Sequence, residues 1–150
     1  MTTHDIRAIT AAETRPLRQA ILRPHQRIEE LVYRGDDEPE TLHAGAFHEG
    51  VLVGIATVSP TPCPRAEFTA PWQLEGMATT PEVRGLGYGR ALIEACLAHV
   101  AAHGGLTLWC NGRTSAAGFY LKLGFQPVGE EFVTTTGPHY VFFTRLQGFI

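Results

Sequence analysis

The chain has 150 residues, the size of one ordinary domain with a single core, and nothing in the sequence suggests a second domain. Its hydrophobic fraction of 44% and charged fraction of 18% are those of a globular protein, and its net charge of −3 excludes the basic footprint of a nucleic-acid binder. No run of about 18 apolar residues and no signal-peptide pattern occurs, so we expect no membrane partner.

Cysteine usage bears on the compartment. Cys63, Cys96 and Cys110 are odd in number and widely spaced, without a C-x-x-C pair. This pattern suits reduced thiols, with Cys96 in the core, rather than a disulfide framework. We therefore expect a cytoplasmic protein.

The first predicted elements are a strand and a helix. Residues 6–9 alternate apolar and polar side chains, which predicts a strand. Thr10 and Glu13 have the spacing of a capping box and open a helix that Pro24 ends or bends. A shorter helix is expected over residues 28–32. Three apolar side chains of the first helix are expected to face the core: Leu17, Ala20 and Ile21.

An acidic loop and a hairpin follow. Residues 35–40, with Glu29 and Glu30, hint at a cationic substrate, and a solvated surface is the alternative. Residues 43–48 and 51–58 are predicted strands around a tight Glu49-Gly50 turn. Four prolines from Pro60 to Pro71 then predict an irregular loop.

A glycine-rich turn lies at the centre of the chain. Residues 72–78 form an apolar run that predicts a strand, and Pro81 stops it because proline cannot donate to a sheet ladder. Arg84-Gly85-Leu86-Gly87-Tyr88-Gly89 follows, and apolar residues then recur at helical spacing. Glycines let backbone amides approach a ligand, and the helix start supplies unpaired N–H groups. A pyrophosphate, with Arg84 as an added cation, would suit this turn.

Two better-known phosphate motifs do not fit this turn. A dinucleotide fingerprint would need glycine where Arg90 stands, and a P-loop would need Gly-Lys-Ser/Thr, which is absent. What remains is Arg-x-x-Gly-x-Gly over residues 84–89. A helix-capping loop without a ligand is the alternative interpretation.

The last third of the chain predicts a strand, a helix and a hairpin. Residues 106–110 form a short apolar strand, and a helix then ends near Gly124. Residues 125–133 and 140–146 are expected to be two antiparallel strands joined around Thr136-Gly137-Pro138. The helix carries Ala-Ala-Gly-Phe-Tyr-Leu-Lys-Leu-Gly-Phe over residues 116–125.

These two motifs, in this order, resemble those of the GCN5-related N-acetyltransferase (GNAT) family. The resemblance spans nearly the whole chain, because the predicted order of strands and helices is also the family's. It implies an α/β (α+β) fold in one domain over residues 1–150: a central, mostly antiparallel mixed sheet with splayed middle strands and flanking helices. It also implies direct transfer of an acetyl group from acetyl-CoA, as co-substrate and without a metal, to an amine of a small molecule or peptide.

The resemblance implies roles for individual residues. Backbone groups next to the splay would pair with pantetheine and the thioester oxygen, and Tyr120 would face the thioester sulfur as general acid. A phenol of pKa about 10 can protonate a thiolate of pKa about 8.5, whereas core packing is the alternative for Tyr120 and the expected role of Phe119. The residues expected at the cofactor are Met77, Ala78, Thr79, Arg84, Gly85, Leu86, Gly87, Tyr88, Gly89, Arg90, Asn111, Arg113 and Phe119.

The acceptor side is less defined. Glu75 is the best single candidate for the general base, because a carboxylate on this strand often serves as base in relatives. Glu30, Glu131 and His139 are alternatives and candidate substrate-binding residues, since the Gly-Pro-His turn resembles one branch of the family whose final hairpin borders the acceptor pocket. A solvated surface role competes at all four positions.

One position departs from the family pattern. Many relatives carry Asn seven residues before the tyrosine, where this chain has Arg113, with Asn111 two residues earlier. Arg113 could instead meet a phosphate or an acidic acceptor. His99 and His103 have the i, i+4 spacing of metal ligands, but no third ligand is evident and we favour a solvent-edge pair.

Two other functions compete with acetyl transfer. A non-catalytic acyl-CoA-binding regulatory module would need the cofactor site without the acid, and a longer-chain acyltransferase would prefer propionyl-CoA or succinyl-CoA. Dimers are common in the family, and the apolar residues 148–150 would be a plausible homodimer contact.

Overall fold

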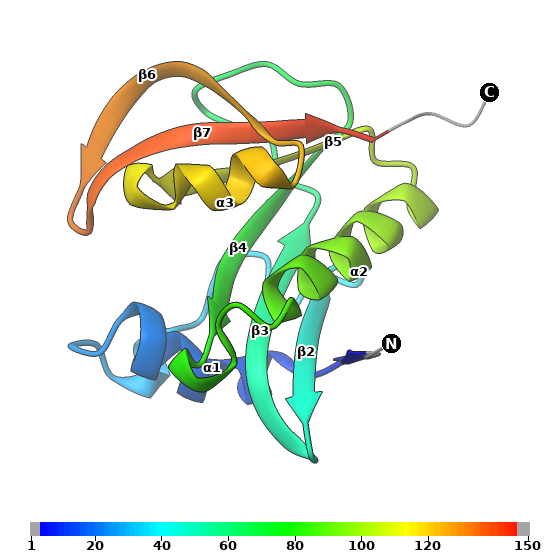
Figure 1. Cartoon of the computed structure of the whole chain (residues 1–150). Coiled ribbons are helices and arrows are strands. Elements are labelled where there is room, and N and C mark those ends of the chain that lie inside the picture. Colours follow the sequence, from blue (N-terminus) through cyan, green and yellow to red (C-terminus); the bar gives the residue numbers. More distant parts are fainter. Residues whose placement is uncertain (1–3, 147–150) are drawn as a thin grey trace.

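Seven strands form one mixed sheet in the computed structural model, which describes residues 4–146 (Figure 1). The strand order is β1-β2-β3-β4-β5-β7-β6, and every neighbouring pair is antiparallel except the parallel pair β4 and β5. The predicted mixed, mostly antiparallel sheet is confirmed. The strands are β1 (Asp5–Ala8), β2 (Leu42–His48), β3 (Val51–Ser59), β4 (Pro71–Thr79), β5 (Thr107–Arg113), β6 (Gln126–Thr134) and β7 (Gly137–Arg145).

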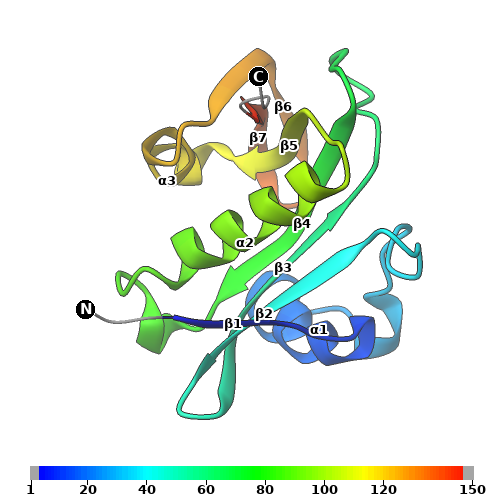
Figure 2. The same cartoon turned by 90° about the vertical axis from the view of Figure 1, so that its right-hand side faces the viewer.

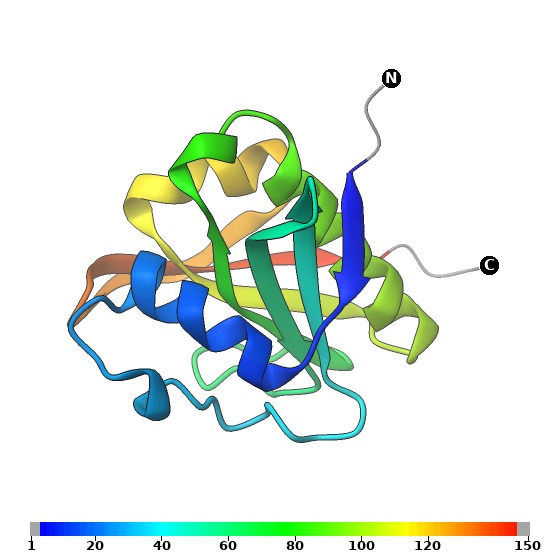
Figure 3. The ribbon, with the colours of Figure 1, turned by 90° about the horizontal axis from the view of Figure 1, so that it is seen from below.

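Helices cover both faces of the sheet. The helix α2 packs on β2, β3 and β4, and α3 packs on β5, whereas α1 packs on β2 and β3 from the other side (Figures 2 and 3). We call these the α2 face and the α1 face. The helical segments are α1 (Ala11–Leu17), η1 (Arg18–Leu22), η2 (Ile28–Glu30), η3 (Pro81–Val83), α2 (Tyr88–Ala102), η4 (Thr114–Ala116) and α3 (Ala117–Lys122).

The middle strands separate along their length. Residues 71–73 of β4 pair with residues 107–109 of β5, and beyond Gln73 the edge of β4 that faces β5 has no strand partner among residues 4–146. A bulge at the same level shifts the β3–β4 register, so that Thr57 pairs with Glu75 but Ile55 pairs with Ala78. Gly76 in this bulge has φ +61°, a conformation that glycine accepts without strain. The predicted splay is confirmed.

The core lies between the sheet and α2. Leu92, Ile93, Cys96 and Val100 of α2 are buried against strand residues such as Leu108. The predicted apolar stripe and the core position of Cys96 are confirmed. Each fully buried aliphatic side chain contributes about 1.5–3 kcal/mol to folding, and the helix is held firmly on the sheet.

The first helix agrees with the sequence at its start and differs on its buried side. Thr10 and Glu13 form the predicted capping box, with backbone-to-side-chain bonds of 2.9 and 3.2 Å. The prediction for the inward residues is wrong for Ala20, which is exposed, whereas Leu17 and Ile21 are half-buried. The fully buried side chains of this segment are those of Thr14 and Arg18. Arg18 can face the core because it meets a buried carboxylate, described below.

Two other boundaries shift. The second helix is only the 3₁₀ turn η2, shorter than the expected residues 28–32. The final hairpin turns at residues 135 and 136, so β7 already begins at Gly137. The proposed dimer contact at residues 148–150 lies outside the described residues. No helix within residues 4–146 is long and apolar enough to cross a membrane.

Candidate active site

A cavity of about 1060 Å³ opens where β4 and β5 separate. The strands β4 and β5, the glycine turn, α3 and the β6–β7 hairpin all contribute to its wall. The structure therefore brings together parts of both sequence motifs and two acceptor-side candidates, Glu75 and His139. The predicted site residues that line it are Glu75, Met77, Ala78, Thr79, Arg84, Gly85, Gly87, Tyr88, Gly89, Arg90, Asn111, Arg113, Phe119, Tyr120 and His139.

Three predicted site residues do not line the cavity. Glu30 bonds Arg27 in the exposed η2 turn, and the Glu131 carboxylate accepts a bond from the Thr114 hydroxyl on the exposed side of β6. The side chain of Leu86 points to solvent. The structure thus gives Glu30 and Glu131 no place beside the cavity and makes them surface residues, whereas Leu86 belongs to the turn only through its backbone.

The glycine turn presents the start of α2 to the cavity. Gly85 and Gly87 have φ of +80° and +87°, and Gly87 is the N-cap, without a side-chain cap bond. The first N–H groups of α2 therefore have no acceptor within residues 4–146, and they form an anion site with the positive end of the helix dipole. This geometry fits a pyrophosphate.

Two histidines, His4 and His48, fix this turn through hydrogen bonds, and the sequence interpretation missed both. His4 Nε2 donates to the Leu86 carbonyl at 2.7 Å, and the His4 ring packs edge-on against Tyr88. The Tyr88 hydroxyl is hydrogen-bonded to His48 Nδ1 at 3.0 Å. Tyr88 is consequently an inward-facing anchor of the turn. These hydrogen bonds join residues 40 and 82 positions apart, and no local pattern marks them.

The free edge of β4 continues the cavity from the turn. Around Met77, Ala78 and Thr79 the backbone on the β5 side lacks a strand partner, so it can pair with an extended ligand chain. A Cβ at Gly89 would lie 3.1 Å from the Phe119 ring and 3.3 Å from Met77 Cε, so these groups pack closely at the turn. Phe119 is 38% exposed and lines the cavity, so its predicted core position is wrong.

Tyr120 lies on the α2 face at the inner end of the splay. Its ring stacks on Phe142 at 4.9 Å, and a Cβ at Gly112 would come within 2.7 Å of both rings, so glycine is needed there. Burial raises the pKa of Tyr120, the neighbouring Cys110 thiol raises it further, and Arg113 opposes the shift. Burial also raises the pKa of Cys110, to about 12. Tyr120 is therefore a protonated phenol at the cavity wall and also part of the core.

Glu75 is the carboxylate of the cavity. Burial raises the pKa of Glu75 above its ordinary value of 4.5, nearby Asp36 adds to the shift, and the Arg18 charge opposes it. The ring of Tyr33 forms the neighbouring wall. Because a raised pKa brings a carboxylate closer to neutrality, Glu75 is better suited to accept a proton than an ordinary surface glutamate.

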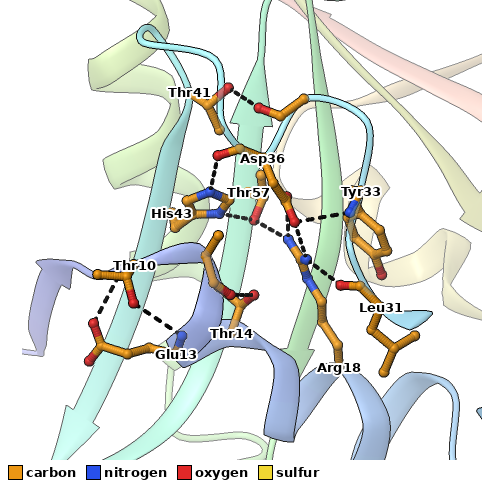
Figure 4. A network of polar contacts seen from close by, with 12 residues as sticks. Thr10, Glu13, Thr14, Arg18, Leu31, Tyr33, Asp36, Thr41, His43 and Thr57 are labelled. Atoms are coloured by element: carbon orange, nitrogen blue, oxygen red, sulfur yellow. Dashed lines mark hydrogen bonds and ion pairs between the residues drawn. The ribbon is translucent and has the colours of Figure 1, made fainter. Parts of the chain in front are cut away.

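A buried ion pair supports this wall (Figure 4). Arg18 Nη1 and Nη2 donate to the two Asp36 carboxylate oxygens at 2.8 and 3.0 Å, and both side chains are 0% exposed. Arg18 also donates to the Leu31 carbonyl and to Thr57 Oγ1, and its guanidinium lies 3.7 Å from the centre of the Tyr33 ring. The network therefore fixes Tyr33 next to Glu75.

Asp36 is the main correction to the sequence interpretation of the acidic loop. Burial alone raises the pKa of Asp36, but the bonds from Arg18 and from the Tyr33 N–H outweigh it and hold the pKa below 3.8. Its carbonyl also accepts a bond from His43 Nε2 at 3.0 Å. Asp36 is thus a structural anion, and the other acidic residues of the loop do not line the cavity. The loop supplies no carboxylate for a cationic substrate.

His139 is a second basic group at the cavity. Its Nδ1 donates to the Gly137 carbonyl at 2.8 Å, so Nε2 is the ring nitrogen that can face a ligand. The Thr136 hydroxyl lies 3.4 Å from Nε2. His139 therefore stays an alternative to Glu75 as proton acceptor.

The histidine pair on α2 is not part of the cavity. The rings of His99 and His103 are 4.1 Å apart, but His99 Nε2 donates to the Glu40 carbonyl and His103 Nδ1 bonds the His99 carbonyl. These bonds occupy one nitrogen of each ring. Among residues 4–146 no group of three His, Cys, Asp or Glu side chains could hold a metal ion.

Comparison with known proteins identifies a family and similar chains. The family model described as "Acetyltransferase (GNAT) family" matches residues 5–125. The chain is 35% identical over 144 residues to the uncharacterized N-acetyltransferase YitI of Bacillus subtilis (strain 168), covering 95% of this chain and 97% of that protein.

Solved structures show the same fold. Ard1 from Thermoplasma volcanium superposes with a TM-score of 0.76 at 18% identity, covering 98% of this chain and 100% of that one. An aminoglycoside 6'-N-acetyltransferase complexed with coenzyme A superposes with a TM-score of 0.72 at 17% identity, covering 94% and 96%.

Proposed function

The chain belongs to the GNAT acetyltransferase family, and from this membership we propose that it transfers an acetyl group from acetyl-CoA directly to an amine of a small molecule or peptide. One observation carries the proposal. A helix-start anion site, an unpaired strand edge and a buried phenol meet in a single cavity.

The α2 face supplies the groups that would hold the donor. The amides of the glycine turn, with Arg84 and Arg90, suit the pyrophosphate, and the free edge of β4 suits the pantetheine arm. Acetyl-CoA, when bound, supplies the acetyl group as a thioester. The β4 amides at the splay would then stabilise the negative charge that develops on the carbonyl oxygen.

Two side chains would move the protons. Glu75, across the cavity from the donor groups, would take a proton from the acceptor ammonium, so that the amine nitrogen can form the new C–N bond. Tyr120 would give its proton to the CoA sulfur as the C–S bond breaks, and solvent would restore it. His139 is the alternative proton acceptor. Asn111 lines the same cavity as a polar contact.

A non-catalytic acyl-CoA-binding module is the second candidate. It would use the same anion site and strand edge, but it would not need a protonated phenol at the end of the cavity. The position of Tyr120 favours catalysis. Three free cysteines, two of them buried, fit a reducing cytoplasmic environment for either function.

The test is release of CoA thiol from acetyl-CoA with pooled amino acids, N-terminal peptides, polyamines and aminoglycosides, with acetylated product identified by mass. Acceptor-dependent release with acetylated product is the expected result. Binding of acetyl-CoA without release from any pool would favour the non-catalytic module, and faster release from propionyl-CoA or succinyl-CoA would correct the acyl group.

A further inference from the structure

The charges around the cavity are strongly unequal. Its wall carries one carboxylate, Glu75, and five Arg or Lys side chains. Phosphate groups of a CoA donor account for cations near the glycine turn, but cations far from that turn need another explanation. The five are Arg23, Arg84, Arg90, Arg113 and Lys122.

Arg113 points to the α1 face. A Cβ at Gly112 would contact the Tyr120 and Phe142 rings, so Gly112 faces α3 on the α2 face. Successive residues of a strand point to opposite faces, so Arg113 points to the other side. His139 is the register partner of Arg113 on β7 and shares this orientation.

Glu75 points to the same side as Arg113. It pairs with Thr57, whose hydroxyl bonds Arg18 on the α1 face. Gln73, two residues before Glu75, is in register with Trp109, which lies four residues before Arg113 on its strand. The alternation along both strands therefore places Glu75 and Arg113 on one face.

Two arginines on this face have no acidic partner. Arg113 makes no side-chain hydrogen bond or ion pair within residues 4–146, and Arg23, directly after η1, bonds only the neighbouring Leu22 carbonyl there. The loop of residues 35–40 makes no ion pair with them, because Asp36 is paired with Arg18 and the other acidic residues of the loop do not line the cavity. Both guanidinium groups remain available to a ligand.

A donor phosphate does not explain Arg113. The anion site lies at the N-terminus of α2, whereas Arg113 directly follows Gly112, which packs against the Tyr120 ring at the opposite end of the donor path. The guanidinium group of Arg113, at that end, therefore faces the acceptor. This planar group matches a carboxylate through two parallel hydrogen bonds.

We propose that the acceptor is an amine that also bears a carboxylate, with Glu75 at the ammonium and Arg113, assisted by Arg23, at the carboxylate. This inference rests on the proposed function. It names amino acids and short peptides with a free C-terminus as the substrate class. Polycationic amines are disfavoured, because two arginines would repel them and one carboxylate would attract them.

The test compares each amino acid with its C-terminal amide, which lacks the carboxylate, and follows how this comparison changes between variants. The kcat/KM for each amino acid is divided by that for its C-terminal amide, and the ratio is measured in the native chain, Arg113→Gln and Arg23→Gln. Charge-assisted bonds of this kind favour the carboxylate about tenfold or more. We expect such a ratio in the native chain and a fall toward one in Arg113→Gln. A ratio is insensitive to how much of a variant folds.

Lys122→Gln is the matched control, because Lys122 lines the cavity from α3 on the α2 face. It should leave the ratio unchanged while it alters the KM for acetyl-CoA. A ratio near one in the native chain, a preference for polyamines, or a ratio untouched by both arginine variants would overturn the inference.

A second measurement separates this inference from the proposed function. If no acceptor releases CoA thiol, the affinity of the CoA-bound protein for N-acetyl amino acids and for their amides is measured by calorimetry. Tighter binding of the acids, lost in Arg113→Gln, supports the carboxylate site even though acetyl transfer has failed. Equal affinity for acids and amides overturns the site.

Discussion

The two faces of the sheet build their parts of the cavity in different ways. On the α2 face, the turn, the strand edge and Tyr120 come from two stretches, residues 77–90 and 110–120, and backbone groups do much of the work. On the α1 face, the wall depends on side chains from η1, the loop after η2, β4, β5 and β7, held by one buried ion pair. The faces should therefore fail separately when residues are changed.

The largest expected effect is on the α2 face. Gly87→Glu should abolish acetyl-CoA binding, because φ of +87° disfavours any side chain, a Cβ there would lie 3.1 Å from the His4 ring that holds the turn, and a negative charge on the turn would repel phosphate. The affinity of the variant for acetyl-CoA is measured by calorimetry.

Gly104→Glu is a matched control for this change. Gly104 follows the C-terminal end of the same helix, has φ +79°, and faces open space, so it imposes the same backbone strain away from the cavity. Equal loss of binding in both variants would mean that helix strain, not the anion site, is responsible. Micromolar binding by Gly87→Glu would contradict the pyrophosphate assignment.

The difference between the faces also explains what the sequence could predict. The glycine turn and the helix after it follow from contiguous residue types with a local physical meaning, whereas the splay and the role of the β4 backbone are implied by the family resemblance. The family resemblance supplied the role of Tyr120. These elements depend little on distant side chains.

The α1 face depends on pairings that no local pattern shows. In the sequence Arg18 looks like an ordinary charged surface residue of a helix. Only its contact with Asp36, 18 residues later, makes it a core residue. Because of the same contact, the loop of residues 35–40, which looks like an acidic surface loop in the sequence, has a structural role. Glu30 and Glu131 are plausible bases from sequence alone, and their exclusion needs the three-dimensional register.

Tyr120→Phe should give the second largest effect. Loss of the general acid should lower kcat by about a hundredfold or more, whereas the affinity for acetyl-CoA should hold because the ring still stacks on Phe142. Thiol-release kinetics measure kcat, and calorimetry measures the affinity for acetyl-CoA. Tyr140→Phe, which also loses a hydroxyl from this core, should retain activity. Normal turnover by Tyr120→Phe would show that another group protonates the thiolate.

Breaking the buried ion pair should damage stability and spare donor binding. Arg18→Met leaves the Asp36 carboxylate buried without its partner, which costs about 3–5 kcal/mol of unfolding free energy. Arg18→Met/Asp36→Leu should recover much of this loss, since no charge is left buried. Denaturant unfolding measures both. The exposed pair of Arg7 and Asp5 offers the control, as Arg7→Met should change stability far less than Arg18→Met does. A similar small loss in Arg18→Met would show that the pair does not support the α1 face.

The smallest expected effect is on the pH dependence of kcat/KM. Its measurement shows which group on the α1 face is the general base. Glu75 accepts a proton only when ionised, and its pKa in the folded protein is raised above 4.5 by burial. Activity should therefore be full above that raised pKa and fall about tenfold for each pH unit below it. The acidic limb should start at a higher pH than an ordinary glutamate would give. It should disappear in Glu75→Gln, with a low and flat rate, and persist in His139→Gln. The reverse pattern would assign the proton transfer to His139 Nε2.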